Sequence, residues 1–311
     1  MRAASNHAWA VVLAAGAGSR LAPLTRRLYG YPLPKQFAEL GEGRTLLQQT
    51  LTRVGRVIPP ARTVVVAAAD YASLAREQLS GFAGVELVLQ PANRGTGPGA
   101  LLPLSHVRRR AGRLDVVAIF PSDHHFADDR PLLAAVAEAI TAARSSNGLI
   151  LLGIAAERPE TGYGWIEPAR ADSGHGDLRP VRRFIEKPPA GVAAELLARG
   201  ALWNTLIVVG RLDAVWRAAR IHLAEQARRF DRYDAAGCHS DLAALYRDMP
   251  AADLSRDLLQ RTDRLAVTRV DGTGWNDWGT PKRVLESLAG STRAELLARL
   301  RRPPLLPARS A

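Results

Sequence analysis

The sequence has little cysteine, few aromatic residues and few lysines. Its one cysteine, Cys238, cannot form a disulfide within the chain, which fits a reducing compartment, so we expect a cytoplasmic protein. No apolar run approaches the roughly 20 residues that span a bilayer, and a membrane partner is not expected. An apolar content of 47% and a charged content of 23% are typical of a globular protein whose 311 residues bury one large core or two smaller ones.

The low aromatic content, 6% of the chain, also bears on the class of partner. A net charge of +12 and a pI near 10.8 suggest nucleic-acid binding. However, the arginines are spread over the whole length, and the aromatic residues are too few for an obvious base-stacking surface. We therefore expect no nucleic-acid partner. The alternative, a nucleic-acid binder, predicts DNA affinity that falls steeply with salt.

Lysine is scarce among the basic residues. Only three of the 42 basic residues are lysines, at positions 35, 187 and 282. In a chain so rich in arginine, a remaining lysine indicates a role that a guanidinium cannot take over. Lys35 and Lys187 stand in the short motifs P-K-Q and E-K-P, which makes them candidates for anion binding.

Apolar runs alternate with helical patterns through the first half of the sequence. This alternation favours an α/β fold with a Rossmann-like mixed, mostly parallel sheet and helices on both faces. Ligands of such sheets gather at the carboxyl ends of the strands. The expected strands are 9–14, 63–69, 85–90, 115–120 and 148–154, and the expected helices are 46–57, 72–79, 99–110 and 130–145.

From about residue 160 the expected strands become shorter, and no linker rich in proline, glycine or serine separates the halves. We interpret the second half as a smaller lobe of the same domain, and its amphipathic stretch 211–230 as a candidate homodimer interface. An arginine-rich helix at 292–302 precedes a tail that we expect to fray. The strands of this half are expected at 163–167, 181–186, 202–209 and 265–270, and its other helices at 190–199, 239–247 and 254–261.

The first strand runs into a glycine-rich loop that is followed by two cations, an order that suits a polyphosphate. Gly16 and Gly18 allow backbone N–H groups to turn toward an anion. Arg20 then supplies a forked cation and Lys35 a point charge. The dinucleotide-binding fingerprint G-x-G-x-x-G is not met, because Leu21 stands at the position of its third glycine. The Walker P-loop is excluded as well, because no G-K-[ST] follows the glycines. The glycines alone are therefore weak evidence for a nucleotide site. A secretory signal core at 8–15 is a further alternative, disfavoured by its short length.

Two aspartates follow apolar strands in separate loops. Asp123 stands in F-P-S-D-H-H and Asp277 in G-T-G-W-N-D-W-G. Two carboxylates at strand ends are the minimum for holding Mg²⁺ on a nucleotide, because the ion keeps its other positions for water and phosphate oxygens. Each aspartate could instead cap a helix or a turn. His124 and His125 raise the alternative of zinc, but no further ligand follows at zinc spacing, and we interpret His124 as a partner that orients the loop.

A third group of polar residues lies in the second half. Glu186 and Lys187 end an apolar strand, where the lysine can bind a monoester phosphate and the glutamate can accept from sugar hydroxyls. An exposed ion pair is the alternative. The segments T-G-Y-G-W and L-W-N-T offer an aromatic wall and an amide, Asn204, that suit a polyol. For Trp165 and Trp203, burial in the core is an equally good interpretation.

These motifs occur in an order that resembles one known superfamily. The superfamily is the nucleoside-diphosphate-sugar pyrophosphorylases, and the resemblance covers about residues 9–290 through V-L-A-A-G-A-G-S-R-L-A-P-L-T, P-K-Q-F, Q-P-A-N-R-G-T-G-P-G, P-S-D-H, T-G-Y-G-W-I, F-I-E-K-P and W-N-D-W-G. Within it, the bacterial mannose-1-phosphate guanylyltransferases are most similar, through P-K-Q-F, Q-P-x-N-R-G-T, P-S-D-H and F-x-E-K-P.

The resemblance implies roles for residues by their position in these motifs. The metal ligands that it implies, for Mg²⁺, are Asp123 and Asp277. The nucleotide-binding residues that it implies are Ala14, Ala15, Gly16, Gly18, Ser19, Arg20, Gln90, Asn93, Gly95 and Thr96, of which Gln90, Gly95 and Thr96 fall where the family reads the base. The sugar-phosphate-binding residues that it implies are Gly164, Glu186, Lys187 and Asn204. The catalytic residues that it implies are Arg20, Lys35, Asp123, Lys187 and Asp277.

The activity that the resemblance implies is nucleotidyl transfer. A sugar 1-phosphate attacks the α-phosphorus of an NTP in line and pyrophosphate leaves, with GTP and mannose 1-phosphate as the expected substrates and GDP-mannose as the product. Glucose 1-phosphate with dTTP or UTP is one alternative, and a non-catalytic regulatory protein that senses a nucleotide sugar is another. The implied catalytic domain is 1–290, with a nucleotide-binding lobe at about 1–160 and a sugar-phosphate-binding lobe at about 161–290, before a helix and tail at 291–311.

The sequence departs from the family pattern at several places. Eight residues separate Thr25 from Pro34, which predicts an enlarged loop at 26–33. D-W-G replaces the usual D-V-G, which puts Trp278 beside the metal site. Thr205-Leu206 replaces a small pair of residues in the sugar-contacting motif, which predicts an altered sugar pocket. We also expect no isomerase domain of the kind that longer relatives carry.

Overall fold

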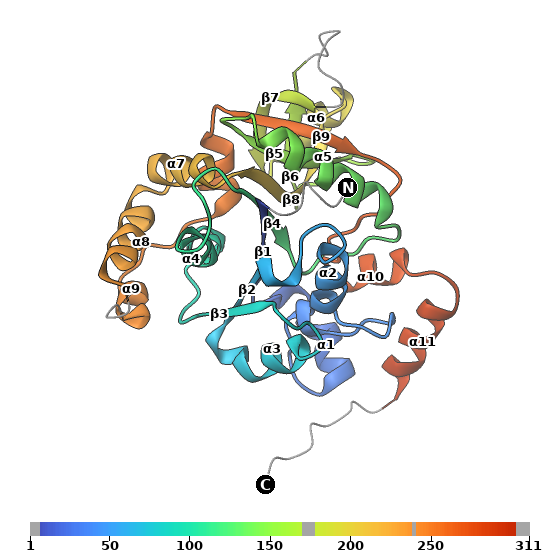
Figure 1. The fold of residues 1–311 in the computed structure, drawn as a ribbon. Helices are drawn as coiled ribbons and strands as arrows, with labels where there is room; N and C mark the ends of the chain where they lie inside the picture. The colour runs from blue at the N-terminus through green and yellow to red at the C-terminus, as the bar shows by residue number, and fades with distance from the viewer. Residues whose placement is uncertain (1–6, 170–177, 238–240, 303–311) are drawn as a thin grey trace.

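The computed structural model describes residues 7–169, 178–237 and 241–302. Cys238 and the tail expected after residue 302 lie outside these ranges. In the described part of the chain, a single sheet of nine strands forms the centre of the molecule (Figure 1). Its strands are β1 (Ala8–Ala14), β2 (Thr63–Ala68), β3 (Glu86–Gln90), β4 (Val116–Pro121), β5 (Leu149–Ala155), β6 (Gly164–Pro168), β7 (Leu178–Glu186), β8 (Leu202–Arg211) and β9 (Leu265–Val270).

The sheet is mixed, as predicted, but four of its strand pairings are parallel and five are antiparallel, so it is less parallel than expected. Its order is β3-β2-β1-β4-β8-β5-β9-β7-β6, and the start of β8 also pairs with β6. Strands β1 to β4 run parallel to one another, as do β5 and β9. Strands β7 and β8 run against their neighbours. The continuous apolar runs of β1, β2 and β4 fit this arrangement, because both faces of a central parallel strand are buried.

Helices cover both faces of the sheet (Figure 1). They are α1 (Ala22–Tyr29), α2 (Leu46–Val54), α3 (Ala72–Leu79), α4 (Thr96–Arg108), α5 (Arg130–Ala143), α6 (Ala190–Ala198), α7 (Leu212–His222), α8 (Ala224–Ala236), α9 (Leu242–Arg247), α10 (Pro281–Ser287) and α11 (Gly290–Arg301). Successive residues of β1 enter two separate cores: Ala10 and Val12 pack with α2 and α5, whereas Trp9 and Val11 pack with α4, α7 and α8. These two layers confirm the predicted fold class.

The segment that leads to Lys35 differs from the loop predicted for it. Its first part is α1, which has a proline in its first turn and ends at Gly30, where φ is 83°. The backbone N–H of Leu33 then donates to Oγ1 of Thr25 at 3.1 Å. The predicted enlarged loop at 26–33 is therefore half helix and half a tight return, because a proline and a glycine delimit a helix at its two ends.

Two other stretches differ from the elements predicted for them. The stretch 211–230 forms two helices, α7 and α8, on either side of Leu223, and both bury an apolar face in the second core. The homodimer interface expected there stays a prediction. The stretch 254–261 is a π-helical turn, Leu254–Leu258, followed by a short 3₁₀ turn instead of an α-helix.

The predicted polar segments lie at one edge of the sheet. The glycine-rich loop and the loops after β3, β4 and β9 all leave the carboxyl ends of strands that run in the same direction. Ligand-binding residues are expected at this edge of an open α/β sheet. In the described ranges, no helix is both long enough and apolar enough to cross a membrane.

Candidate active site

The glycine-rich loop at 15–18 is held by a side chain from the P-K-Q-F segment. Nε2 of Gln36 donates to the carbonyl oxygens of Ala14 at 2.8 Å and Gly16 at 2.7 Å. Two acceptors that would repel a phosphate are thereby satisfied inside the protein. Gly18 has φ of 59°, and a Cβ at that position would lie 2.8 Å from the backbone nitrogen of Lys35. Glycine is therefore required where the loop passes the P-K-Q-F segment.

Lys35 lies between the two predicted metal ligands. Its ammonium group is buried, lies 3.1 Å from Oδ2 of Asp123, and donates to the backbone carbonyl oxygen of Asp277. The more exposed Arg20 approaches from the glycine-rich loop, with Nη2 at 3.8 Å from Oδ2 of Asp277. A cavity of about 190 Å³ is lined by Arg20, Lys35, Asp123 and Ser19. The structure thus brings together Arg20, Lys35, Asp123 and Asp277, which come from separate motifs of the sequence.

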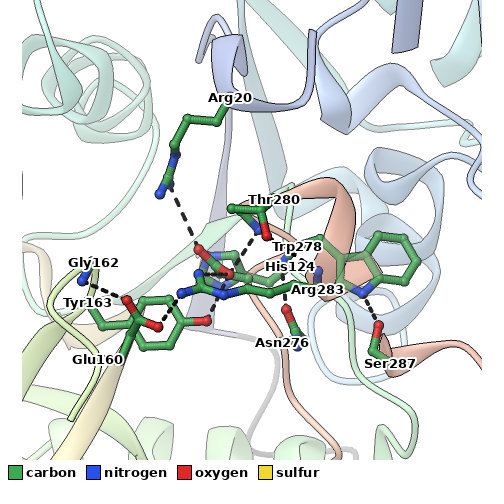
Figure 2. A network of polar contacts seen from close by, with 12 residues as sticks. Arg20, His124, Glu160, Gly162, Tyr163, Asn276, Trp278, Thr280, Arg283 and Ser287 are labelled. Carbon is green, nitrogen blue, oxygen red and sulfur yellow. Dashed lines mark hydrogen bonds and ion pairs between the residues drawn. The ribbon is translucent and has the colours of Figure 1, made fainter. Parts of the chain in front are cut away.

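Asp277 is held by a network of polar contacts that includes Tyr163 and Arg283, both labelled in Figure 2, and one of its carboxylate oxygens accepts three hydrogen bonds. Its Oδ1 accepts from the hydroxyl of Tyr163 at 2.8 Å, from the N–H of Gly279 at 2.9 Å and from Nη1 of Arg283 at 3.0 Å. Its Oδ2 faces Arg20 and is available to a ligand. Three donors on Oδ1 therefore fix the direction in which Oδ2 points.

Arg283 is fixed in turn by Glu160. Its Nη2 forms an ion pair with Oε2 of that glutamate, and its guanidinium lies 4.9 Å from the centre of the Tyr163 ring. Oε1 of Glu160 accepts from the backbone N–H of Gly162 at 2.9 Å. Helix α10, which carries Arg283, and the turn before β6 thus support the loop that carries Asp277.

The charges of the site lower the pKa of both aspartates. Burial by itself raises the pKa of Asp123 and of Asp277, but the ammonium of Lys35 and the other charges and hydrogen bonds around each carboxylate together outweigh it, and each pKa lies below its usual value. Both carboxylates are therefore ionised at neutral pH. Burial raises the pKa of the Tyr163 hydroxyl, which keeps it protonated as a donor to Asp277.

His124 connects the loop after β4 with the loop after β9. Burial lowers its pKa to about 4, so the ring is neutral at physiological pH. Its Nδ1 accepts from Nε1 of Trp275 at 3.2 Å, which leaves the proton on Nε2, 3.8 Å from Asp123. The orienting role predicted for His124 agrees with these contacts.

Trp278 and His125 pack against each other beside the site. Their rings stack with centres 4.4 Å apart, and the Trp278 indole donates to Oγ of Ser287 at 2.6 Å. Trp278 borders the cavity beside Lys35 as the D-W-G motif predicted, but its ring is buried and directed toward Ser287 (Figure 2). Among the described residues no group of three His, Cys, Asp or Glu side chains is placed to hold a metal, which gives the zinc alternative no support.

A second cavity, of about 220 Å³, lies where the chain leaves β1 and β3. The motif Q-P-A-N-R-G-T and the glycine-rich loop together line it, as the resemblance implied for the base of a nucleotide. Among the predicted nucleotide-binding residues, those that line it are Ala15, Gly16, Gln90, Asn93, Gly95 and Thr96.

The backbone of this motif is closed by the segment before the π-helical turn. The N–H of Gly97 donates to the carbonyl oxygen of Ala252 at 2.8 Å, and the N–H of Ala252 donates to that of Arg94 at 3.0 Å. Gly95 has φ of 84°, and a Cβ there would overlap the carbonyl oxygen of Ala252. Chain segments about 155 positions apart therefore form one wall of the second cavity.

The predicted sugar-phosphate residues also lie together. A Cβ on Gly164 would lie 2.6 Å from Oε2 of Glu186 and 3.2 Å from Cβ of Asn204. Nζ of Lys187 is half-exposed and lies 2.9 Å from Oε1 of Glu186, whose own side chain is buried. Lys187 has φ of 49°, and its N–H donates to the carbonyl oxygen of Tyr163 at 3.1 Å. Tyr163 therefore joins this group to Asp277, since its hydroxyl donates to the aspartate.

The residues that replace the small pair expected after the sugar-contacting asparagine form a hydrogen-bonded turn. Leu206 has φ of 59°, a conformation that glycine adopts without strain. Oγ1 of Thr205 donates to the carbonyl oxygen of Leu152 at 2.7 Å, and Oδ1 of Asn204 accepts from the N–H of Leu206 at 3.1 Å. These bonds hold the strained turn in place.

The predicted aromatic wall is mostly core. Trp165 is 0% exposed and Trp203 is 4% exposed, and their rings meet edge to face with centres 6.2 Å apart. Tyr163 packs against Trp203 at 5.2 Å, with Trp275 on its other side at 5.1 Å. The core interpretation of Trp165 and Trp203 is therefore the correct one, and only Tyr163 reaches the site.

Several residues that shape the site were not assigned from the sequence. Gln36 lies in the motif P-K-Q-F and Tyr163 in the motif T-G-Y-G-W, so their position beside predicted site residues could have identified them. Arg283 and Glu160 carried no sequence signal, because a surface helix and a turn supply them from outside the motifs. Ser122, buried after β4, donates to the carbonyl oxygen of Leu13 at 2.7 Å and fixes the Asp123 loop to β1.

The donor set fits the Mg²⁺ that the resemblance implies. A magnesium ion takes oxygen ligands and keeps several waters, so that one or two carboxylates suffice from the protein. Asp123 and Oδ2 of Asp277 would supply two such oxygens. Both carboxylates lie close enough to the ammonium of Lys35 for its charge to lower their pKa.

Comparison with known proteins supports the same interpretation. The model of the nucleotidyl transferase family matches residues 9–293. The alginate biosynthesis protein AlgA of Pseudomonas aeruginosa is 31% identical over 282 aligned positions, and the match covers 87% of this chain and 56% of AlgA. The mannose-1-phosphate guanylyltransferase of Escherichia coli K12 is 30% identical over 296 residues, 89% of this chain and 59% of that protein. The chain thus spans less than three fifths of the length of these two relatives.

Solved structures show the same fold. A crystal structure from Thermus thermophilus, described as mannose-1-phosphate geranyltransferase, has a TM-score of 0.80 and 26% identity over 92% of this chain and 80% of its own. A UDP-glucose pyrophosphorylase bound to UDP-glucose, at 13% identity and a TM-score of 0.57, covers 93% of this chain and 98% of its own and shares the fold alone. These matches confirm the resemblance seen in the motifs: the chain belongs to the nucleotidyl transferase family.

Proposed function

We propose that the chain joins GTP and mannose 1-phosphate into GDP-mannose and releases pyrophosphate. Membership of the nucleotidyl transferase family supports the class of reaction. The name of the Escherichia coli relative supports the two substrates. The observation that carries the proposal is the chain of contacts at the centre of the site, in which Tyr163 joins Asp277 to Lys187. It supports the proposal because one residue links the lysine expected to bind the sugar phosphate with the aspartate expected to bind the metal.

The proposed reaction needs no covalent intermediate on the protein. Arg20 and Lys35 bind the phosphates that leave as pyrophosphate, and Lys187 binds the attacking phosphate of the sugar 1-phosphate. Asp123 and Asp277 would hold Mg²⁺, which when bound neutralises charge on the α-phosphate. Alignment of the attacking oxygen and stabilisation of charge then account for catalysis.

A screen of NTPs against sugar 1-phosphates, read by pyrophosphate release, tests this function. We expect GTP with mannose 1-phosphate to have the highest kcat/KM of all pairs. A higher value for dTTP or UTP with glucose 1-phosphate would overturn the proposed substrates. If no pair of substrates releases pyrophosphate and the protein binds GDP-mannose tightly, the proposed catalytic activity is wrong and the protein is a sensor of a nucleotide sugar.

The metal assignment has its own test. Asp123→Asn should abolish turnover at saturating Mg²⁺ while the circular dichroism spectrum is unchanged, because the amide lacks the charge that holds the ion. Asp128→Asn is the matched control: its carboxylate lies in the same loop but is bonded to the exposed Arg130. Turnover by Asp123→Asn at the rate of the control would remove Asp123 from the metal site.

A further inference from the structure

One acid lies in the cavity that the base-binding motif forms. Asp253 lines this cavity of about 220 Å³ together with Gln90 and the glycine-rich loop. It belongs to the segment just before the π-helical turn, in the second half of the chain. A carboxylate repels phosphate groups, so an acid at this place suits the base of a nucleotide and not its phosphates.

The position of Asp253 is fixed by the backbone around it. The preceding residue, Ala252, forms both hydrogen bonds that close the wall of the cavity, with Gly97 at 2.8 Å and Arg94 at 3.0 Å. The N–H of Asp253 itself donates to Oδ2 of Asp257 at 2.7 Å. The carboxylate is therefore presented by a segment that is hydrogen-bonded to the base-binding motif.

The carboxylate of Asp253 has hydrogen-bonding capacity left. Its Oδ1 accepts from the N–H of Arg256 at 2.9 Å, and its Oδ2 accepts from the hydroxyl of Thr96 at 3.3 Å. An ionised carboxylate offers about four acceptor positions, so each oxygen can accept once more. The same contacts are those of a helix cap, and the experiment below separates the two roles.

Gln90, whose side chain lines the cavity, carries a buried acceptor that is unpaired in the described part of the chain. Nε2 of Gln90 donates to the carbonyl oxygen of Ala92 at 2.6 Å, and this contact fixes which end of the amide is the oxygen. Its Oε1 is buried and, in the described part of the chain, has no hydrogen-bond donor. A buried unpaired acceptor costs free energy, and a donor on a ligand would recover it.

The two acceptors suit one base better than the others. Guanine carries two adjacent donors on one edge, N1–H and the N2 amino group. Uracil and thymine offer one N–H between two carbonyl oxygens, which a carboxylate repels. Adenine and cytosine offer one amino group beside a ring nitrogen that accepts. A carboxylate is therefore the side chain that favours guanine over all four.

We propose that Asp253 selects guanine by accepting hydrogen bonds from its N1–H and N2 amino group, with Gln90 as the second acceptor in the cavity. The inference rests on the proposed nucleotidyl transfer but concerns the base alone. It assigns base selection to a segment of the second half, about 160 residues away from the motif that forms the rest of the cavity.

Asp253→Asn with three purine nucleotides tests the assignment. Inosine triphosphate lacks the N2 amino group, and the unchanged protein should prefer GTP to it by at least about tenfold in kcat/KM, the usual effect of a hydrogen bond to a charged group. In Asp253→Asn this preference should shrink to about threefold or less. Xanthosine triphosphate carries a carbonyl oxygen at C2, to which the new amide can donate, so its use relative to GTP should rise at least about tenfold.

The matched control is Asp241→Asn. Asp241 caps α9 through the N–H of Ala243 at 2.8 Å and lies outside the cavity. It should keep the GTP to ITP ratio of the unchanged protein. If Asp253 acts only as a cap, Asp253→Asn will also keep that ratio, because asparagine caps equally well, and the inference is overturned.

The gain of xanthosine triphosphate use distinguishes base selection from damage, since a misfolded protein gains no substrate. Failure of the proposed function looks different. If the unchanged protein prefers UTP or dTTP, the proposed substrates fall and the inference falls with them. If it uses GTP while Asp253→Asn keeps the GTP to ITP ratio and gains no XTP use, only the inference falls.

Discussion

At the scale of single residues, the site depends on which oxygen of Asp277 is left free. Three donors occupy Oδ1, and two of them, Tyr163 and Arg283, come from other elements. Groups that orient a ligand without touching the substrate commonly change metal affinity by about 10- to 100-fold when removed. Tyr163 is therefore a positioning residue for Asp277.

Tyr163→Phe should raise the Mg²⁺ concentration for half-maximal activity by about tenfold and leave KM for GTP nearly unchanged. The reason is that Oδ1 loses one donor and the carboxylate can rotate. Tyr29→Phe is the control, because its hydroxyl donates to the carbonyl oxygen of Glu39 at 2.9 Å, on α1 and away from the site. An Mg²⁺ titration of both variants decides: an equal shift in both would show a general loss of stability instead.

The two glycines of the first loop should respond differently to alanine. Gly18→Ala should lower the free energy of unfolding by about 1–3 kcal/mol, because it combines φ of 59° with a Cβ 2.8 Å from the backbone of Lys35. Gly16→Ala should change it by about 0.5 kcal/mol or less, since no atom lies within 4 Å of its Cβ and its φ is not positive. Urea unfolding of both variants measures this, and equal losses would refute the steric argument.

At the scale of elements, an acid on α8 connects three helices on one face of the sheet. Oδ1 of Asp231 accepts from Nη1 of Arg108 on α4 and from Nε1 of Trp216 on α7, both at 3.0 Å. Its Oδ2 accepts from Nε of Arg220 on α7 at 3.0 Å, and Arg108 also lies 3.8 Å from the Trp216 ring. Burial raises the pKa of Asp231, but these donors lower it by more, so its pKa lies below the usual value.

Asp231→Asn should therefore lower stability at pH 7 by about 1–3 kcal/mol. A carboxyl with a lowered folded-state pKa contributes stability above its unfolded pKa of about 3.9 and loses it as the pH falls through the folded pKa. The difference between Asp231→Asn and the unchanged protein should thus shrink below about pH 4, as measured by urea unfolding across pH. Asp271→Asn, which breaks an exposed pair with Arg269, should have almost no effect at any pH.

At the scale of the whole molecule, the cavity that we propose for the base is built by both halves of the chain. The first half supplies Gln90 and the motif that ends at Gly97, and the second supplies Ala252 and Asp253. The predicted lobes therefore share a site, although the division into lobes stays a prediction. A nucleotide that binds there should stabilise both segments together.

Hydrogen exchange with and without the guanosine nucleotide measures this coupling. Peptides that cover 93–99 and 250–258 should gain protection together, because the amides of Gly97 and Ala252 are bonded across the two segments. A peptide from α6, away from the cavity, should exchange at its former rate. Protection of 93–99 alone would show that the second segment does not close on the nucleotide.

The sequence predicted the fold well where local patterns were strong. Strands β1, β2 and β4 appear within one or two residues of their predicted bounds, because continuous apolar runs mark strands buried on both faces. It failed at α1, read as an enlarged loop, because a short helix with its apolar face on a core has no clear pattern in eight residues. It also failed at 254–258, since a π-helical turn differs from an α-helix only in its hydrogen bonds.

The sequence by itself determined the family, the sheet with its two helical layers, and the positions of the motif residues, because glycine, lysine and aspartate at strand ends are local requirements of phosphate and metal binding. Only the tertiary structure decided that Lys35 contacts both Asp123 and Asp277, that Arg283 and Tyr163 hold Oδ1 of Asp277, and that Asp253 lines the same cavity as Gln90. These contacts join elements far apart in the chain, and their geometry depends on packing that no local pattern encodes.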